Sequence, residues 1–141
     1  MVNTFPDTGI VTAPVKDPES PDDGEKAISY LENRGITKEL IKEFKIGLSL
    51  SDNGLSKMLS NKGYSSLELE SYGLGNGRGD LYINRIMFPL FDTTDRPVGF
   101  SGRVYIGKVS SGKYINTKET PIFKKGELLY NYFKAKEFVR L

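Results

Sequence analysis

The chain has 141 residues, of which 38% are hydrophobic and 27% charged, and its formal net charge is +2. This composition suits a single folded domain with a core of its own. Cysteine and histidine are both absent, which excludes disulfides, thiolate nucleophiles, imidazole bases and ordinary zinc sites. No run reaches the roughly 18 apolar residues of a membrane span, and the amino terminus lacks a secretory signal. We therefore expect a cytoplasmic protein without a membrane partner.

The charge is distributed unevenly along the chain. Residues 1–75 carry 8 basic and 12 acidic side chains, a net charge of −4. Residues 76–141 carry 12 basic and 6 acidic side chains, a net charge of +6. This asymmetry points to a polyanionic partner for the second half of the chain.

The amino terminus is predicted to be irregular. Residues 1–20 mix Pro, Asp, Thr and Val without periodicity, and we interpret them as a disordered tail or linker. An ordered domain is expected over residues 21–141. Its first helix is predicted to begin after Ser20, an N-cap residue followed by Pro21, and to end before Gly35. The expected buried stripe of this helix consists of Ala27, Ile28, Tyr30 and Leu31.

Three further short helices complete a helical part over residues 21–75. Thr37 is the expected N-cap of the second helix, and the third is predicted at about 52–62. In the fourth, Ser65 and Glu68 have the spacing of a capping box. None of these helices carries an obvious chemical motif.

A glycine-rich segment, GLGNGRGD, follows at residues 73–80. It lacks the G-x-G-x-x-G spacing because Asp80 stands where the third glycine would be, so we interpret it as a flexible connector. The pattern then changes to that of a sheet over residues 80–125. The run RIMFPLF, residues 85–91, is apolar on both faces, and Pro89 favours an edge position or a bulge.

The segment VGFSGRVY, residues 98–105, alternates between two faces of this sheet. A third strand is expected at about 113–117. Residues 126–138 have the pattern of an amphipathic helix that covers the apolar side of the sheet. The predicted fold class is therefore α+β, with a lead of short helices, a small mostly antiparallel sheet and a C-terminal covering helix.

The acidic residues have structural explanations. Asp22 and Asp23 lie at a helix start, where acids are favoured, and Asp92 and Asp95 lie in a turn where they accept backbone hydrogen bonds. No catalytic or metal-ligating residue is predicted in the chain.

Basic residues, in contrast, gather on the predicted sheet and on the loop that leaves it. Each lysine alone suits a solvated loop. Together with Tyr114 and Phe123, the set suits a groove that follows a phosphate backbone and stacks a base, although both aromatics also fit as residues that pin the loop to the core. The basic set consists of Arg85, Arg103, Lys108, Lys113, Lys118, Lys124 and Lys125.

Several segments resemble, in order, a known family. YLENRGITKELIKEFKIG, RIMFPLFD, RPVGFSGRVY and GKYINTKETPIFKKGELLYNYFKAK resemble the N-terminal subdomain of the RNA polymerase core of bacterial DnaG-type primases. The resemblance implies a DNA primase, a nucleotidyltransferase that synthesises RNA primers on single-stranded DNA during replication. In that family the subdomain packs against a Toprim domain, and a basic cleft between them holds the template and incoming ribonucleoside triphosphates.

Four basic residues match family positions. The resemblance implies template and nucleotide binding for Arg103, Lys113 and Lys125. Arg85 also matches, although its place within a strand leaves a structural role open. We expect this piece to form the basic side of the cleft.

The sequence also departs from the family. Leu81 and Ile83 stand where the family has two arginines, so template contacts are expected to move, with Arg78 as a candidate. Lys124 replaces a family histidine, and Lys118 replaces a family proline. Both lysines are therefore candidates for additional phosphate contacts.

The Toprim motifs E-G-x-x-D and D-x-D, which hold Mg²⁺ or Mn²⁺ in the family, are not found in the chain. We therefore expect a piece of a primase that is inactive alone and binds neither metal nor zinc itself. Its expected partners are single-stranded DNA, ribonucleoside triphosphates, the Toprim domain of the same polypeptide and, for the full-length protein, a replicative helicase. The alternative is a stand-alone module that binds single-stranded nucleic acid or protein and has no polymerase activity.

Overall fold

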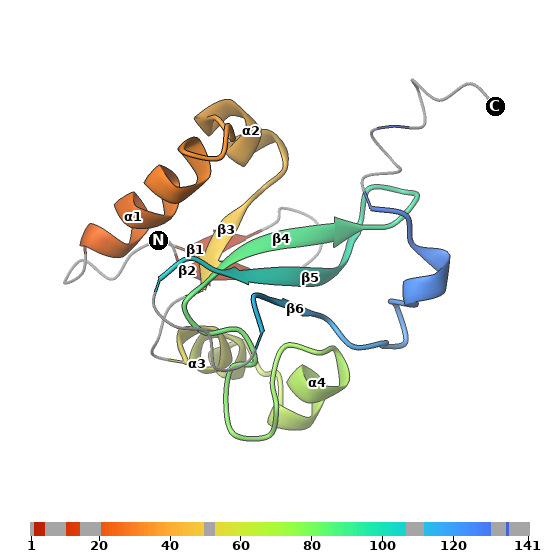
Figure 1. The fold of residues 1–141 in the computed structure, drawn as a ribbon. Coiled ribbons are helices and arrows are strands. Elements are labelled where there is room, and N and C mark those ends of the chain that lie inside the picture. The colour runs from red at the N-terminus through yellow and green to blue at the C-terminus, as the bar shows by residue number, and fades with distance from the viewer. Residues whose placement is uncertain are drawn as a thin grey trace.

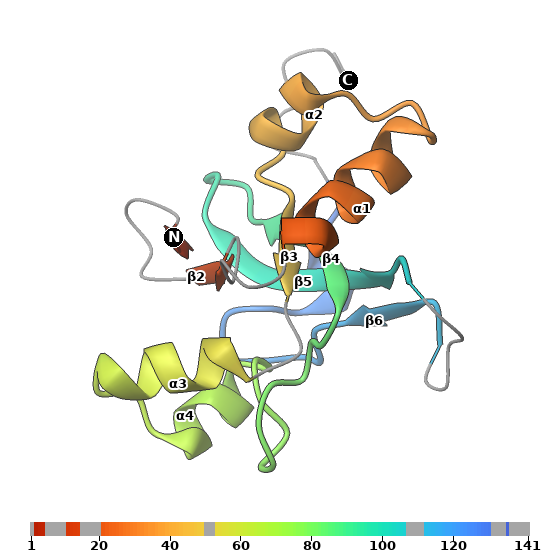
Figure 2. The ribbon, with the colours of Figure 1, turned by 90° about the vertical axis from the view of Figure 1, so that its left-hand side faces the viewer.

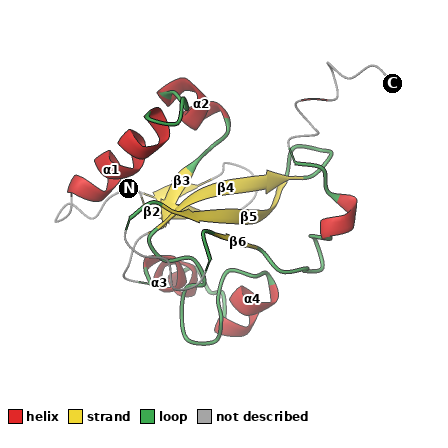
Figure 3. Ribbon diagram, viewed as in Figure 1, coloured by secondary structure: helices red, strands yellow, loops and turns green. Residues whose placement is uncertain are grey.

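The structure is a computed structural model that describes residues 2–4, 11–14, 21–49, 53–106, 112–130 and 135 of the chain. Two pairs of short helices lie on opposite sides of an antiparallel sheet (Figures 1 and 2). Figure 3 distinguishes the helices from the strands. The predicted α+β class is confirmed over the described residues.

The helical lead follows its predicted caps. The Thr37 hydroxyl accepts a hydrogen bond from the Leu40 N–H at 3.3 Å. The Ser65 N–H donates to the Glu68 carboxylate at 2.7 Å, and the Glu68 N–H donates to the Ser65 hydroxyl at 3.3 Å, which confirms the capping box. The first helix begins at Pro21 as predicted. The four helices are α1 (Pro21–Glu32), α2 (Lys38–Glu43), α3 (Gly54–Asn61) and α4 (Ser66–Ser71).

The central sheet has four antiparallel strands in the order β3-β4-β5-β6. The predicted strand segments at residues 85–91 and 98–105 are β4 and β5, which pair with each other, and the predicted third strand is β6. The sequence pattern does not predict β3, whose pairing with β4 joins segments distant in the chain. The strands are β3 (Gly47–Ser49), β4 (Arg85–Phe91), β5 (Pro97–Val104) and β6 (Tyr114–Asn116).

Pro89 lies where β4 has one neighbouring strand among the described residues. β3 pairs with β4 only over Arg85–Met87, so in this part of the structure β5 alone borders the strand at Pro89. The register of the β4–β5 pair also shifts between Leu90 and Phe91. The predicted edge position and irregularity are therefore both present close to Pro89.

One face of the sheet, which we call the α1 face, carries Ile86 and is covered by α1 at one end. Ile86 packs there with Ala27, Leu31 and Leu48. Ile28, which was expected in the same buried stripe, is instead 37% exposed. The buried stripe on α1 is therefore narrower than predicted.

The opposite face, which we call the Tyr82 face, is covered by the segment between α4 and β4. Tyr82 is 2% exposed, and its ring packs edge-on against Phe100 with centroids 6.3 Å apart. Met87 completes this cluster, and Leu74 joins it to the cluster between α3 and α4. This segment, rather than a C-terminal helix, covers the Tyr82 face in the part of the chain that the structure describes.

The glycine-rich segment is fixed at its C-terminal end by hydrogen bonds of Asp80. Asp80 is 4% exposed, and its carboxylate accepts hydrogen bonds from the N–H groups of Leu55 at 3.2 Å and Ser56 at 2.8 Å, at the start of α3. The Asp80 N–H donates to Asn53 Oδ1 at 2.9 Å. The segment thus differs from the flexible connector predicted, because Asp80 caps a helix that is distant in sequence.

The amino terminus contains two short strands where a disordered tail was predicted. β1 (Val2–Thr4) and β2 (Val11–Pro14) pair antiparallel, and β2 contacts β3 and α3. Strands of three or four residues are too short to produce a periodic pattern. The remaining residues of 1–20 lie outside the described part of the chain.

The predicted C-terminal helix does not begin at residue 126. A single 3-10 turn, η1 (Lys125–Glu127), occupies that position, and residues 128–130 are not helical. Apart from Ala135, the rest of the predicted range 126–138 lies outside the described residues.

Candidate nucleic-acid interface

Arg103 on β5 occupies the centre of the candidate site. Its guanidinium Cζ lies 5.6 Å from the ring centroid of Tyr30 and 4.8 Å from that of Tyr114. The Nε group also donates a hydrogen bond to the Tyr30 hydroxyl. These cation–π contacts and the hydrogen bond fix the arginine on the α1 face.

Two different elements bring the tyrosines to Arg103. Tyr30 lies in the last turn of α1 and is half-buried. Tyr114 is the cross-strand partner of Arg103 in the β5–β6 pair and is 53% exposed. The interpretation of Tyr114 as a pin into the core is therefore wrong, because its ring rests on Arg103 and stays accessible.

Arg34 extends this arrangement. Its Cζ lies 4.8 Å from the ring centroid of Tyr30, and its side chain is exposed. Arg34, Tyr30, Arg103 and Tyr114 thus form a series of alternating cations and aromatics, which we call the cation–aromatic row. Arg34 is not among the predicted site residues, because it falls in the acidic half of the chain. Its i, i+4 spacing from Tyr30 at a helix end is the sequence signal for this contact.

Arg103 carries a permanent charge. A guanidinium is protonated at every physiological pH, and the hydrogen bond to the Tyr30 hydroxyl raises the pKa of Arg103 further above its already high usual value. A guanidinium is also the side-chain group whose planar fork matches a phosphate bidentately. The row therefore presents a permanent cation suited to phosphate, flanked by aromatic rings.

A hollow of about 400 Å³ borders the row on the α1 face. Tyr114 belongs to both the row and the hollow, while Ser101 and Asn116 are cross-strand partners within it. Exposed aromatic rings beside hydroxyl and amide groups are the surface on which unpaired bases stack and form hydrogen bonds. The hollow is lined by Phe88, Leu90, Ser101, Tyr114, Asn116 and Tyr130.

Arg85 does not join the row. It is 4% exposed and lies on the Tyr82 face, where its guanidinium donates to the carbonyl oxygens of Gly102 at 3.0 Å, Lys113 at 3.3 Å and Gly112 at 3.3 Å. Of the two roles open for Arg85, this geometry favours the structural one.

The lysines expected in the site are exposed and lie at different places. Lys113 directly precedes β6 and is next to Tyr114 in the chain, and Lys118 follows the same strand. Lys124 and Lys125 lie at η1, and Lys124 lines a second hollow together with Phe91. Phe91 pairs with Pro97, six residues from Arg103 along β5, a separation of roughly 20 Å.

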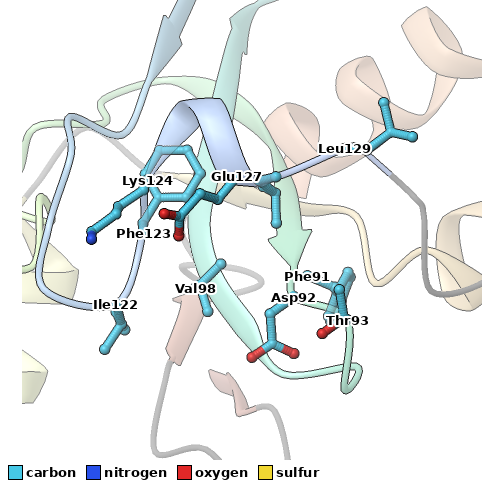
Figure 4. A pocket seen from close by; sticks show the side chains of 10 residues that line it. Phe91, Asp92, Thr93, Val98, Ile122, Phe123, Lys124, Glu127 and Leu129 are labelled. Carbon is cyan, nitrogen blue, oxygen red and sulfur yellow. The ribbon is translucent and has the colours of Figure 1, made fainter.

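The second hollow has a volume of about 520 Å³ and apolar residues at its centre. Figure 4 shows Phe91, Val98 and Phe123 around it, with Lys124 extending away from Phe91. Phe123 is 4% exposed, so its ring cannot stack a base and instead pins the loop to the core, which is one of its two predicted roles.

The remaining candidate, Arg78, lies in the glycine-rich segment. Its side chain is exposed, and its N–H donates to Asn76 Oδ1 at 3.0 Å. The segment lies on the α3 and α4 side of the sheet (Figure 2), away from the α1 face. Lys108 lies outside the described residues.

The carboxylate of Asp92 has a structural role. Asp92 accepts hydrogen bonds from the N–H groups of Thr94 at 2.8 Å and Arg96 at 3.0 Å, as predicted. Burial raises the pKa of Asp92, but hydrogen bonds from Thr94 and Arg96 outweigh this effect, so the pKa lies below its usual value. No group of three or more acidic side chains that could hold a metal ion is found among the described residues. These residues therefore do not fit a two-metal site.

The helices do not suit a membrane span. Within the described ranges, none is long and apolar enough to cross a bilayer. The longest, α1, has 12 residues, whereas about 20 are required.

The fold and the site define a class: a small α+β domain that presents fixed cations and aromatic rings on an open sheet face, a surface chemistry typical of nucleic-acid binding. Comparison with known families agrees. Residues 18–136 match the family model described as DNA primase catalytic core, N-terminal domain. The chain belongs to this family.

Curated relatives include the DNA primase of Staphylococcus aureus strain COL, which is 43% identical over 125 residues. The match covers 84% of this chain and 20% of that protein. The DNA primase of Staphylococcus epidermidis is 42% identical, with 84% and 21% covered. The chain therefore spans about a fifth of the length of these relatives.

Solved structures agree in fold. The RNA polymerase domain of the Mycobacterium tuberculosis primase DnaG superposes with a TM-score of 0.76 at 29% identity, covering 83% of this chain and 40% of that one. A DnaG primase catalytic domain bound to single-stranded DNA superposes with a TM-score of 0.67 at 34% identity, covering 83% and 38%.

Proposed function

We propose that this domain is part of a DNA primase that synthesises RNA primers during replication, and that the cation–aromatic row holds the single-stranded DNA template. The row itself carries the proposal, because it joins a permanently charged guanidinium to an exposed aromatic ring beside an open hollow. A related catalytic domain that binds single-stranded DNA supports it.

Each part of the row would have its own task. Arg103 and Arg34 would hold phosphates of the template, and Lys113 would add a third cation beside them. Tyr114 would stack a template base, whose polar edge would meet Asn116 in the adjoining hollow. Such stacking contributes about 1–3 kcal/mol per base and tolerates any sequence.

The distant cations would act elsewhere on the same substrates. Lys125 and Lys124 lie about the length of β5 from Arg103, so they would contact a different part of the strand or the triphosphate of an incoming ribonucleotide. Lys118 lies between these two places, and Arg78 would reach the strand only where it passes the opposite side of the sheet.

The chemistry of phosphoryl transfer would come from the remainder of the primase. Mg²⁺ or Mn²⁺ would supply the electrostatic activation of the reacting phosphate, and we assign the ligands of that metal to the Toprim domain of the same polypeptide. This domain would contribute orientation, by holding the template against that neighbour. A replicative helicase would be a partner of the whole protein.

The proposal is tested by titrating a fluorescent single-stranded DNA with the 141-residue chain at several salt concentrations. Replacing Arg103 or Lys113 with Ala should each lower the slope of log affinity against log salt by about 0.7. Lys62→Ala, an exposed lysine directly after α3 on the other side of the sheet, is the matched control and should leave the slope unchanged. Equal slopes for the wild type and the double variant of Arg103 and Lys113 would contradict the proposed binding surface.

A further inference from the structure

Arg85 is a buried cation inside a domain whose other described candidate cations reach the surface: Arg103 is half-buried, and Arg78 and the candidate lysines are exposed. Its side chain is 4% exposed, and three backbone carbonyls accept hydrogen bonds from its guanidinium. Burial lowers the pKa of Arg85, but a guanidinium stays protonated under all physiological conditions. The residue therefore keeps a full charge beneath the strand that carries Arg103.

Gly102 makes room for this side chain. A Cβ at Gly102 would lie 2.8 Å from Tyr82 Cδ1, 3.1 Å from Arg85 Cδ and 3.2 Å from Met87 Sδ. Since real Cβ atoms do not approach other atoms this closely, a larger residue would displace Arg85 or the core around it. The glycine next to Arg103 is thus explained by the packing of Tyr82, Arg85 and Met87 beneath it.

Two of the carbonyl groups that accept hydrogen bonds from Arg85 belong to the residues directly before β6. Gly112 has a φ of +83°, a conformation that glycine adopts without strain. The carbonyl of Lys113 accepts two hydrogen bonds, one from Arg85 and one from the Val104 N–H at 3.0 Å. Arg85 therefore anchors the two residues immediately before Tyr114 from the buried side of the sheet.

We infer that Arg85 is a positioning residue: it sets the backbone at Gly112 and Lys113, and through it the place of Tyr114 over Arg103. A planar guanidinium donates to several carbonyls in one fixed geometry, which the compact ammonium of a lysine does not reproduce. The inference rests on the proposed function where it concerns DNA, and on geometry alone where it concerns the backbone. A direct phosphate contact is incompatible with the burial of Arg85.

The test compares Arg85→Lys with Arg96→Lys in the 141-residue chain. Both substitutions keep the charge, but Arg96 lies in the β4–β5 turn with its side chain 71% exposed. Amide hydrogen exchange of Val104 reports the anchored carbonyl directly, with the Phe100 amide as the internal reference for the stability of the sheet. Titration with single-stranded DNA then reports the effect on binding.

Arg85→Lys should accelerate exchange at Val104 relative to Phe100 and weaken DNA binding about threefold to tenfold, whereas Arg96→Lys should do neither. Adding Tyr114→Ala to Arg85→Lys should cost little more affinity, because both changes remove the same contact. Unchanged exchange at Val104 would overturn the inference, and so would faster exchange with unaltered DNA affinity. If the wild type binds no DNA, the proposed function fails, while the exchange measurement still decides whether Arg85 anchors the backbone.

Discussion

Arg103 and Arg85 are arginines on neighbouring strands with opposite surroundings. Arg85 pairs with Val104, the residue next to Arg103, yet Arg103 lies between aromatic rings on the α1 face and Arg85 lies among carbonyls on the Tyr82 face. The alternation of a strand places successive residues on opposite faces. The face of the sheet from which an arginine projects, rather than its residue type or its position next to the other arginine, thus decides whether it can contact an anion.

The largest expected effect comes from filling the space above Arg85. Gly102→Ala should lower the free energy of unfolding by about 1–3 kcal/mol, because the new Cβ overpacks the site between Tyr82 and Met87. Gly126→Ala is the control, since its Cβ would meet nothing within 4 Å. Urea unfolding measures both. Equal free energies of unfolding for the two variants would contradict the prediction, because they would show that the Tyr82 face accommodates a methyl group at residue 102 without strain.

A second change removes a buried hydroxyl on the same face. The Thr117 side chain is fully buried, and its Oγ1 accepts from the Phe100 N–H at 2.7 Å and lies 2.8 Å from the Tyr82 hydroxyl. Thr117→Val leaves these groups unpaired and should cost about 1–3 kcal/mol of unfolding free energy. Thr120→Val, at a half-buried threonine with a single 3.3 Å bond from Ile122, should cost less. The opposite order in thermal or urea unfolding would contradict the hydrogen-bond network.

The half-buried arginine on the α1 face, Arg103, should give the reverse pattern. Arg103→Ala should weaken single-stranded DNA binding about tenfold, which corresponds to about 1.4 kcal/mol, while changing the free energy of unfolding by less than Gly102→Ala does. Binding is measured by fluorescence anisotropy and stability by urea unfolding. A large loss of stability with intact binding would reverse the roles assigned to the two faces.

The smallest expected effect is a difference in alkaline sensitivity. Burial raises the pKa of Tyr82, so the fold favours its neutral phenol. The stabilisation is complete below the pKa of an unfolded tyrosine, about 10, and is lost as the pH rises towards the folded pKa. Between pH 10 and 11 the wild type should lose up to about 1.4 kcal/mol per pH unit more than Tyr82→Phe. Parallel curves of unfolding free energy against pH would contradict this assignment.

Local signals in the sequence predict much of the fold. The caps at Thr37 and Ser65 and the alternation around Phe100 are determined by residues a few positions apart, and the structure confirms them. β3 and the capping of α3 by Asp80 depend on contacts between segments distant in the chain. A single sequence carries no local pattern for such contacts.

Only part of the candidate site can be predicted from the sequence, because some of its contacts also join segments that are distant in the chain. The basic set read from the sequence includes Arg103, Lys113 and Lys125, and the family resemblance singles out these three, but their roles remain predictions. Arg34 reaches the row only because α1 packs beside β5, with Tyr30 between the two arginines. The burial of Arg85 likewise depends on the face of β4 from which it projects and on the space left by Gly102 on the neighbouring strand. This arrangement is visible only once the two strands are paired.

The central claim, that the cation–aromatic row is the template surface, is tested most directly by mapping backbone amide shifts in NMR spectra as single-stranded DNA is added. The account predicts that the largest shifts cluster at Arg34, Arg103 and residues 113–116, and that they disappear as salt is raised. Shifts confined to α3, α4 and the glycine-rich segment, with the row unaffected, would contradict it.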